Sequence, residues 1–326
     1  MVLFIGPTLL SGIGQTLNKY VNLMGGQYIE LGQPFESNQN VMMWALPVPM
    51  WLDNIPHIKK KSRRVVCMTV CETETVHPEY EKLFRLFDHI VTPSIFCQQV
   101  FMKQFPWISC SVIAVHVPIV KPPKALLFNL PKDKYIFYHI GNVMDPRKNT
   151  KKIIEAFIRL NLPDSLLVLK ATCREPVYWS LPNVHVINGL LPDTAIRGLH
   201  NECHCYVSFS SSEGVGMGAV EAALYNKPVI TTDFGAQPEY INTRYLIRCG
   251  RQELPADDFL FQKGMVWGKP SFEDLLTYMK HAYENKVYYE EHEYTRKKVD
   301  PDTIRRDILN QFSQGDKPVS ENALVF

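Results

Sequence analysis

A short segment of the C-terminal half has two glutamates and three glycines at a spacing that suits anion and sugar binding. It reads Ser-Ser-Ser-Glu-Gly-Val-Gly-Met-Gly-Ala-Val-Glu-Ala over residues 210–222, after a strand expected at Cys205–Phe209. A glycine-rich turn from a strand into a helix directs backbone N–H groups and the positive end of the helix dipole at one point. Helical side chains lean toward the N-terminus, so Glu213 and Glu221 can both reach a ligand held there. The alternative is a helix cap and a solvated acidic face.

A second segment has adjacent cations at the end of an expected strand. Residues 141–149 read Gly-Asn-Val-Met-Asp-Pro-Arg-Lys-Asn and follow an apolar run at Tyr135–Ile140. Cations fixed at a strand end stabilise the charge that grows on a diphosphate as its sugar leaves. Arg147 and Lys148 are therefore candidates for a diphosphate site, with two surface basic residues beside a turn as the alternative.

The elements that must position these segments form two successive α/β modules. Apolar runs alternate with amphipathic stretches over the first 120 residues, and the alternation begins again at Tyr135. This pattern predicts strands of a parallel sheet alternating with helices. We expect domains at 1–125 and 134–300, followed by 301–326, a helix that Asp300-Pro301 opens and a tail. Open α/β sheets bind ligands at the carboxyl ends of their strands, so the site is expected in a cleft between the domains.

Composition excludes several classes of protein. The 326 residues include 35 Lys and Arg against 33 Asp and Glu, so no general field attracts nucleic acid. No apolar run approaches the roughly 18 residues of a membrane span, and the opening residues indicate a strand rather than a signal peptide. Eight scattered cysteines favour a reducing, cytoplasmic location. The basic run Lys59–Arg64 is expected to be a solvated loop, with weak peripheral contact to an anionic membrane as the alternative.

Several motifs together carry a family resemblance. Glu213 and Glu221 have seven residues between them, in the frame E-G-x-G-x-x-x-x-E-A. Asn-Lys-Pro-Val-Ile follows at 226–230, and Gly-Ala-Gln-Pro-Glu-Tyr at 235–240. These segments resemble glycosyltransferase family 4, the retaining GT-B enzymes that use nucleotide sugars. The resemblance implies two Rossmann-like βαβ domains that face each other across a cleft.

The resemblance also implies roles for particular residues. Glu213, Lys148 and Arg147 would be catalytic: Glu213 would bond the hydroxyls of the donor sugar, and the two cations would hold the leaving diphosphate. Glu221 would bond the ribose of the nucleotide. The remaining donor-binding candidates are the amides that open the helix, the glycines of the first strand-to-helix loop, and side chains at three strand ends, namely Gly216, Met217, Gly218, Gly12, Gly14, Asn142, Lys170 and Asn188.

Two departures from the family pattern affect this expectation. Asn142 stands where the family usually has an arginine, so either Arg147 or Lys170 substitutes for it, or diphosphate binding is weaker. Many relatives have a histidine near the strand end at Cys71-Glu72, and Glu72 and His77 are the candidates for the acceptor side here. His116 is a further acceptor-side candidate, with a structural histidine as its alternative. The loop of Gly12 and Gly14 has a plain tight turn as its alternative.

The expected function follows from the resemblance. The chain would move a sugar from a nucleotide sugar, linked to UDP or GDP, to a hydroxyl of a glycan or a lipid-linked acceptor, with retention of configuration. The departing phosphate would take the proton of the acceptor, and neither a metal nor another cofactor is expected. One alternative is a catalytically silent nucleotide-sugar-binding module. A nicotinamide-dependent oxidoreductase using the loop of Gly12 and Gly14 would leave Glu213 and Glu221 unexplained.

Two other patterns are given structural interpretations. Asp300-Pro301-Asp302 has the D-x-D spacing of metal-dependent transferases, but it opens a helix instead of ending a strand, so we interpret it as a cap. Cys203-His204-Cys205 has no second ligand pair nearby, which argues against zinc.

Overall fold

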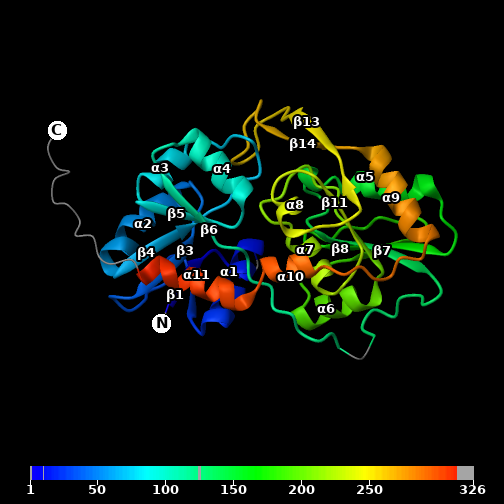
Figure 1. Ribbon diagram of the computed structural model, residues 1–326, viewed down its shortest axis with the longest axis horizontal. Helices are drawn as coiled ribbons and strands as arrows, with labels where there is room; N and C mark the ends of the chain where they lie inside the picture. The colour runs from blue at the N-terminus through cyan, green and yellow to red at the C-terminus, as the bar shows by residue number, and fades with distance from the viewer. Residues whose placement is uncertain (1, 10, 124–125, 314–326) are drawn as a thin grey trace.

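The structure is a computed structural model that describes residues 2–9, 11–123 and 126–313. Its first lobe has a six-stranded parallel sheet in the order β2-β1-β3-β4-β5-β6 (Figure 1). The apolar residues of one helix, α1, pack on one face of this sheet, and those of three others, α2 to α4, pack on the opposite face. The elements are β1 (Val2–Gly6), α1 (Gly12–Met24), β2 (Gln27–Glu30), β3 (Asn40–Trp44), α2 (Pro49–Lys61), β4 (Arg64–Met68), α3 (Tyr80–Phe84), β5 (His89–Thr92), α4 (Ile95–Gln104) and β6 (Ser109–Val112).

The second lobe repeats this construction with the strand order β12-β11-β10-β7-β8-β9, again all parallel. Two helices, α5 and α9, cover one face, while α6 and α7 cover the other. The elements are β7 (Tyr135–Gly141), the 3-10 turn η1 (Pro146–Lys148), α5 (Thr150–Leu160), β8 (Ser165–Ala171), β9 (Val184–Ile187), α6 (Asp193–Glu202), β10 (Cys205–Val207), α7 (Met217–Leu224), β11 (Val229–Thr232), α8 (Gln237–Tyr240), β12 (Leu246–Ile247) and α9 (Phe272–Glu284).

Four further elements complete the described structure. The antiparallel hairpin of β13 (Cys249–Glu253) and β14 (Val266–Pro270) extends from the second lobe toward the first (Figure 1). Helices α10 (Glu293–Lys298) and α11 (Pro301–Ser313) end the described chain, and α11 lies against α1, where Arg305 donates to the carbonyl of Leu23 at 2.9 Å. The Asp300 carboxylate accepts a hydrogen bond from the Thr303 amide at 2.8 Å, which caps α11.

The apolar core does not stop at the boundary between the lobes. One buried cluster includes Phe4 and Tyr20 from the first lobe, Tyr206 from the second, and Ile304 and Ile308 from α11. A sheet buries its apolar face by packing it against another layer of secondary structure, and here the two lobes and α11 share one such buried interior. The predicted architecture of two Rossmann-like parallel-sheet domains is confirmed.

One segment differs from its expectation. The basic run Lys59–Arg64 is not a loop: it closes α2 and begins β4. The helix forms because Trp51, Ile55 and Ile58 bury one face at helical spacing, a pattern that Pro56 obscures in the sequence. Residues 314–326, which include most of the predicted tail, lie outside the described residues. None of the helices in the described ranges combines the length and apolar character needed to cross a bilayer.

Candidate functional site

Two loops at the carboxyl ends of β7 and β10 are joined by their own hydrogen bonds. Asn149, at a positive φ of 51°, donates from Nδ2 to the Phe209 carbonyl at 3.1 Å and to Ser211 Oγ at 2.9 Å. The Ser211 amide in turn donates to the Arg147 carbonyl at 2.8 Å, and Asp145 accepts from the Arg147 amide at 2.9 Å. These bonds hold the cation loop, residues 142–149, beside the glutamate loop, residues 208–216.

The two loops bring Arg147, Lys148 and Glu213 together. Lys148 Nζ is paired with Glu213 Oε1, and Arg147 Nη1 lies 3.3 Å from Glu213 Oε2. Arg147 also donates to the Ser212 carbonyl at 2.6 Å. Its guanidinium lies 3.1 Å from Glu72 and 3.3 Å from Asp145. Because Glu72 belongs to the first lobe, this ion cluster spans both lobes.

The electrostatics of the cluster keep Glu213 ionised. Glu213 is only 6% exposed, and burial alone would raise its pKa, but Lys148 and Arg147 outweigh burial and lower the pKa to about 2. Burial raises the pKa of Glu72 above its ordinary value in spite of Arg147. The pKa of Arg147 is raised, because Glu72, Glu213 and Asp145 outweigh its burial. Glu213 is therefore a buried carboxylate at neutral pH.

These shifts predict acid sensitivity. Glu213 has a pKa of about 2 in the folded protein, so its contribution to the free energy of unfolding is complete above pH 5 and is lost as the pH falls toward 2. At about 1.4 kcal/mol per pKa unit, that contribution is about 3 kcal/mol. Glu72 contributes to the pH dependence of stability with the opposite sign, because burial raises its pKa and folding therefore favours its protonated form. We expect urea unfolding at several pH values to show a shallower decline between pH 5 and 2 for Glu213→Gln than for the natural protein. Parallel declines would contradict this assignment.

A glycine-rich turn opens α7 beside the cluster. Gly216 has φ +84°, and a Cβ there would lie 2.9 Å from Gln237 Nε2. A Cβ at Gly218 would lie 2.3 Å from the Tyr206 hydroxyl, so only glycine lets the helix approach β10 this closely. Met217 is the first helical residue. The first amides of a helix have no partner within it, and those of Met217 and Gly218 are candidates for binding an anion.

Glu221 forms a second ion cluster on α7. Lys19 of α1 pairs with one carboxylate oxygen, and His200 Nε2 lies 3.7 Å from the other. The other ring nitrogen of His200 is bonded to the Tyr138 hydroxyl at 2.8 Å. Burial alone would raise the pKa of Glu221, but Lys19 and His200 lower it to about 2. Both glutamates of the motif are thus ionised and paired with cations.

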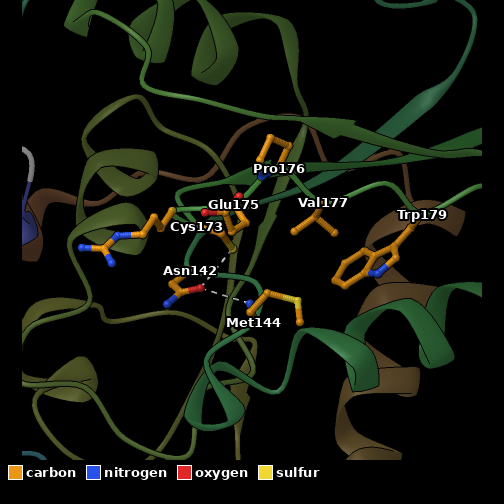
Figure 2. A pocket seen from close by; sticks show the side chains of 8 residues that line it. Asn142, Met144, Cys173, Glu175, Pro176, Val177 and Trp179 are labelled. Atoms are coloured by element: carbon orange, nitrogen blue, oxygen red, sulfur yellow. Dashed lines mark hydrogen bonds between the residues drawn. The ribbon is translucent and has the colours of Figure 1, made fainter.

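The side chain of Asn142 is used in local hydrogen bonds. Its Oδ1 accepts from the Met144 amide at 3.1 Å and from Cys173 Sγ at 3.0 Å (Figure 2). It lines a cavity of about 460 Å³, which Trp179 borders as well. Asn142 thus lies in the cation loop itself, and its amide oxygen is bonded to Met144 and Cys173 instead of Arg147.

Two other strand-end candidates differ in their partners. Asn188 accepts from the Val177 amide at 2.8 Å and donates to the Val177 carbonyl at 2.9 Å, so its side chain holds the loop after β8. Lys170 is 2% exposed, and its ammonium donates to the Ala171 carbonyl at 3.3 Å. Burial lowers the pKa of Lys170. Within the ranges that the structure describes, Lys170 has no carboxylate in ion-pairing distance.

The glycine loop before α1 forms a tight turn. Gly12 begins the helix, and Ser11 Oγ accepts from the Gly14 amide at 3.0 Å. A Cβ at Gly14 would lie 2.3 Å from the Thr8 carbonyl oxygen, which accounts for a glycine at that position.

The two candidate histidines have different surroundings. His77 accepts from the Glu79 amide at 3.2 Å at the start of α3. His116 is 8% exposed, and burial, with Lys19 and Arg305, lowers its pKa to about 4. Neither histidine is bonded to the cluster of Glu213.

Two charged residues at the lobe boundary are not among the predicted site residues. Lys19 belongs to no motif, although its position on α1, the helix that the glycine loop opens, is a usable signal. Glu239, which belongs to the quoted segment 235–240, has a role there that the motif does not specify: its carboxylate accepts from the first amides of α4, from Ile95 at 2.7 Å and from Phe96 at 2.5 Å. Across the described ranges, no group of three or more His, Cys, Asp or Glu side chains could hold a metal ion.

A family model described as "Glycosyl transferases group 1" matches residues 178–256. The match includes Glu213 and Glu221 but not Arg147 and Lys148. A comparison with curated proteins finds no significant match.

Solved structures of glycosyltransferases share the architecture. A TarM variant from S. aureus, in complex with Fondaparinux, alpha-GlcNAc-glycerol and UDP, has a TM-score of 0.57 at 15% identity over 84% of this chain. This chain spans 55% of that protein. Sucrose-phosphate synthase from Thermosynechococcus elongatus has a TM-score of 0.62 at 12% identity, over 96% of this chain and 98% of its own. WaaG, a glycosyltransferase involved in lipopolysaccharide biosynthesis, has a TM-score of 0.55 at 14% identity, over 97% and 100%. The two Rossmann-like domains of this chain therefore have the GT-B fold.

Proposed function

We propose that this protein is a glycosyltransferase of the family 4 type, which moves a sugar from a nucleoside diphosphate sugar to an acceptor hydroxyl. The observation that carries the proposal is the buried, ionised Glu213 held by Lys148 and Arg147 beside the first turn of α7. The family match over 178–256 supports it. So do the solved relatives, one with UDP bound and another a trehalose-phosphate synthase described as UDP-forming.

The proposed chemistry is mainly electrostatic. Lys148 and Arg147 would stabilise the charge that develops on the leaving diphosphate, together with the amides of Gly216, Met217 and Gly218. Glu213 would accept hydrogen bonds from hydroxyls of the sugar. The departing phosphate would take the proton of the acceptor on the same face, which gives retention without a protein nucleophile or a metal.

The other proposed donor contacts surround this centre. Glu221 would accept hydrogen bonds from the ribose. These bonds would replace part of the contact between Glu221 and Lys19. Gly12 and Gly14 would approach from the first lobe, and Asn188 would orient the loop around the base. Of the two candidates to replace the family's arginine at Asn142, we favour Arg147, because it already lies in the ion cluster, with Lys170 as a second cation.

The lobes would divide the work. We propose that 1–125 binds the acceptor, a glycan or lipid-linked hydroxyl, and that 134–300 binds the donor, with α11 (Pro301–Ser313) crossing back to the first lobe. Glu72 is the favoured acceptor-side residue, ahead of His77 and His116, because it reaches the cluster. We also propose that Lys59–Arg64 makes weak peripheral contact with an anionic membrane.

The experiment begins with a thermal-shift panel of UDP- and GDP-sugars, because a ligand that binds only the folded state raises its apparent stability. The donor with the largest shift is then incubated with the natural protein and with Glu213→Ala. We expect slow release of nucleoside diphosphate from the natural protein, faster release with a suitable acceptor, and near-complete loss in the variant. NMR of the product should show the anomeric configuration of the donor. Binding without any release would contradict a transferase.

A further inference from the structure

Arg147 is shared between the lobes through Glu72. The Glu72 carboxylate follows β4 of the first lobe and lies 3.1 Å from Arg147 Nη1. Among the described residues it makes no other ion pair or hydrogen bond. Glu213 is held by two cations, Lys148 and Arg147. The same guanidinium thus holds Glu213 and Asp145 from its own lobe and Glu72 from the other, and within the described ranges Glu72 has no second cation to hold it.

The charges of the cluster leave little free positive charge for an anion. Two cations, Arg147 and Lys148, face three carboxylates, from Glu72, Asp145 and Glu213. A diphosphate that enters this space finds both cations already paired. A carboxylate and a phosphate within about 4 Å of each other repel, more strongly in a partly buried site than in water. One carboxylate must therefore withdraw or become neutral when the diphosphate binds.

Of the two glutamates on Arg147, Glu72 gives way at the lower cost, and Asp145 stays in place as the cap of η1, where it accepts a hydrogen bond from the Arg147 amide. Burial raises its pKa, while that of Glu213 is lowered to about 2, so the folded protein stabilises the charge of Glu213 and not that of Glu72. Glu72 also lies in the segment between β4 and α3, outside both elements. Its side chain is 24% exposed, against 8% for that of Glu213.

We propose that Glu72 is a positioning residue that occupies Arg147 while the donor site is empty, and that the diphosphate of the donor displaces it from the guanidinium. This inference rests on the proposed function. Displacement breaks one ion pair between the lobes and frees the Glu72 carboxylate at the acceptor side of the cluster. Loading of the donor thereby prepares the first lobe for the acceptor.

The test is calorimetric titration of UDP and GDP into the natural protein, Glu72→Gln and Glu74→Gln. Glu74 is a matched control, because it lies two residues along the same segment and pairs with Arg251 of the second lobe at 2.8 Å, away from Arg147. We expect Glu72→Gln to bind the preferred diphosphate about tenfold more tightly, since a competing charge is removed, and Glu74→Gln to bind within twofold of the natural protein. In steady-state kinetics of sugar transfer, Glu72→Gln should have a lower KM for the donor without a rise in kcat.

Other outcomes separate the two proposals. Equal or weaker binding by Glu72→Gln overturns the displacement, and so does equal tightening by Glu74→Gln, which would point to loosened lobes. If the natural protein and both variants bind neither UDP nor GDP, the proposed function itself is overturned. If Glu72→Gln does not fold, Glu72→Asp draws the charge back by one methylene, and we expect two- to fivefold tighter binding; unchanged affinity would again overturn the displacement.

Discussion

Replacing Lys148 with methionine should lower kcat/KM for sugar transfer by about a hundred- to a thousand-fold, the cost of losing one preorganised group that stabilises developing charge. Lys148 is paired with Glu213 and lies in the turn η1, which the Asp145 cap and the Asn149 bonds hold in place. The variant removes a cation from the leaving diphosphate and leaves Glu213 with Arg147 as its cation.

The matched control is Lys151→Met, an exposed lysine three residues away on α5. It changes the same charge without touching Glu213, so we expect its kcat/KM to stay within twofold of the natural value. Steady-state kinetics with the donor identified by thermal shift would make the comparison, with circular dichroism to show that both variants are folded. A Lys148→Met variant that keeps more than a third of the activity would exclude Lys148 as the group that stabilises the diphosphate.

Replacing Gly214 with alanine should have a comparably large effect for a purely steric reason. A Cβ at Gly214 would lie 2.1 Å from Cγ2 of Val70 in the opposite lobe. Valine is stiff at χ1, so the lobes must separate locally. Overpacking of this kind costs about 1–3 kcal/mol, and a shift near 1 Å at reacting groups can cost about a hundredfold in rate. We expect kcat/KM to fall by about 30- to 100-fold, because Glu213 and Glu72 adjoin the clash.

A second substitution provides the check. Val70→Ala removes the clashing methyl group, so the double variant should recover to within about fivefold of Val70→Ala alone. Comparing the two single variants with the double variant measures the coupling between the lobes directly. Natural activity in Gly214→Ala, or a double variant no better than that single variant, would show that the lobes do not need this close approach.

The regular elements could be predicted where apolar contrast is strong. The strands expected at Tyr135–Ile140 and Cys205–Phe209 are β7 and β10, with ends that agree to within two residues, and most of their apolar residues are buried. The edge strand β2 is only four residues long and half-buried, and the hairpin of β13 and β14 is largely exposed, so neither has a clear alternation. Helix α9 did carry a signal in the spacing of Leu275, Met279 and Ala282, whose side chains are fully buried.

The site could be predicted only as far as its local motifs. Glu213 and Lys148 lie in strand-to-helix loops, and Glu221 lies on the helix that follows one of them, so a short stretch of sequence specifies each. The partners that cross the lobes depend on how the two sheets dock. Lys19 and Glu221 are 202 positions apart, and Arg147 meets Glu72 only because the carboxyl ends of β4 and β7 face each other. Side-chain contacts of this kind have no period or spacing in the sequence.

The apolar cluster shared by both lobes has a consequence for how the molecule loses its structure. Tyr20, Tyr206 and Ile304 belong to one buried network, and α11 joins it after the chain has crossed from the second lobe back to the first. Neither lobe can unfold alone without exposing buried apolar residues of the other lobe to water. Heat should therefore unfold both lobes in a single cooperative transition. Hinge movement between the lobes is confined to amplitudes that keep their shared apolar interior out of water.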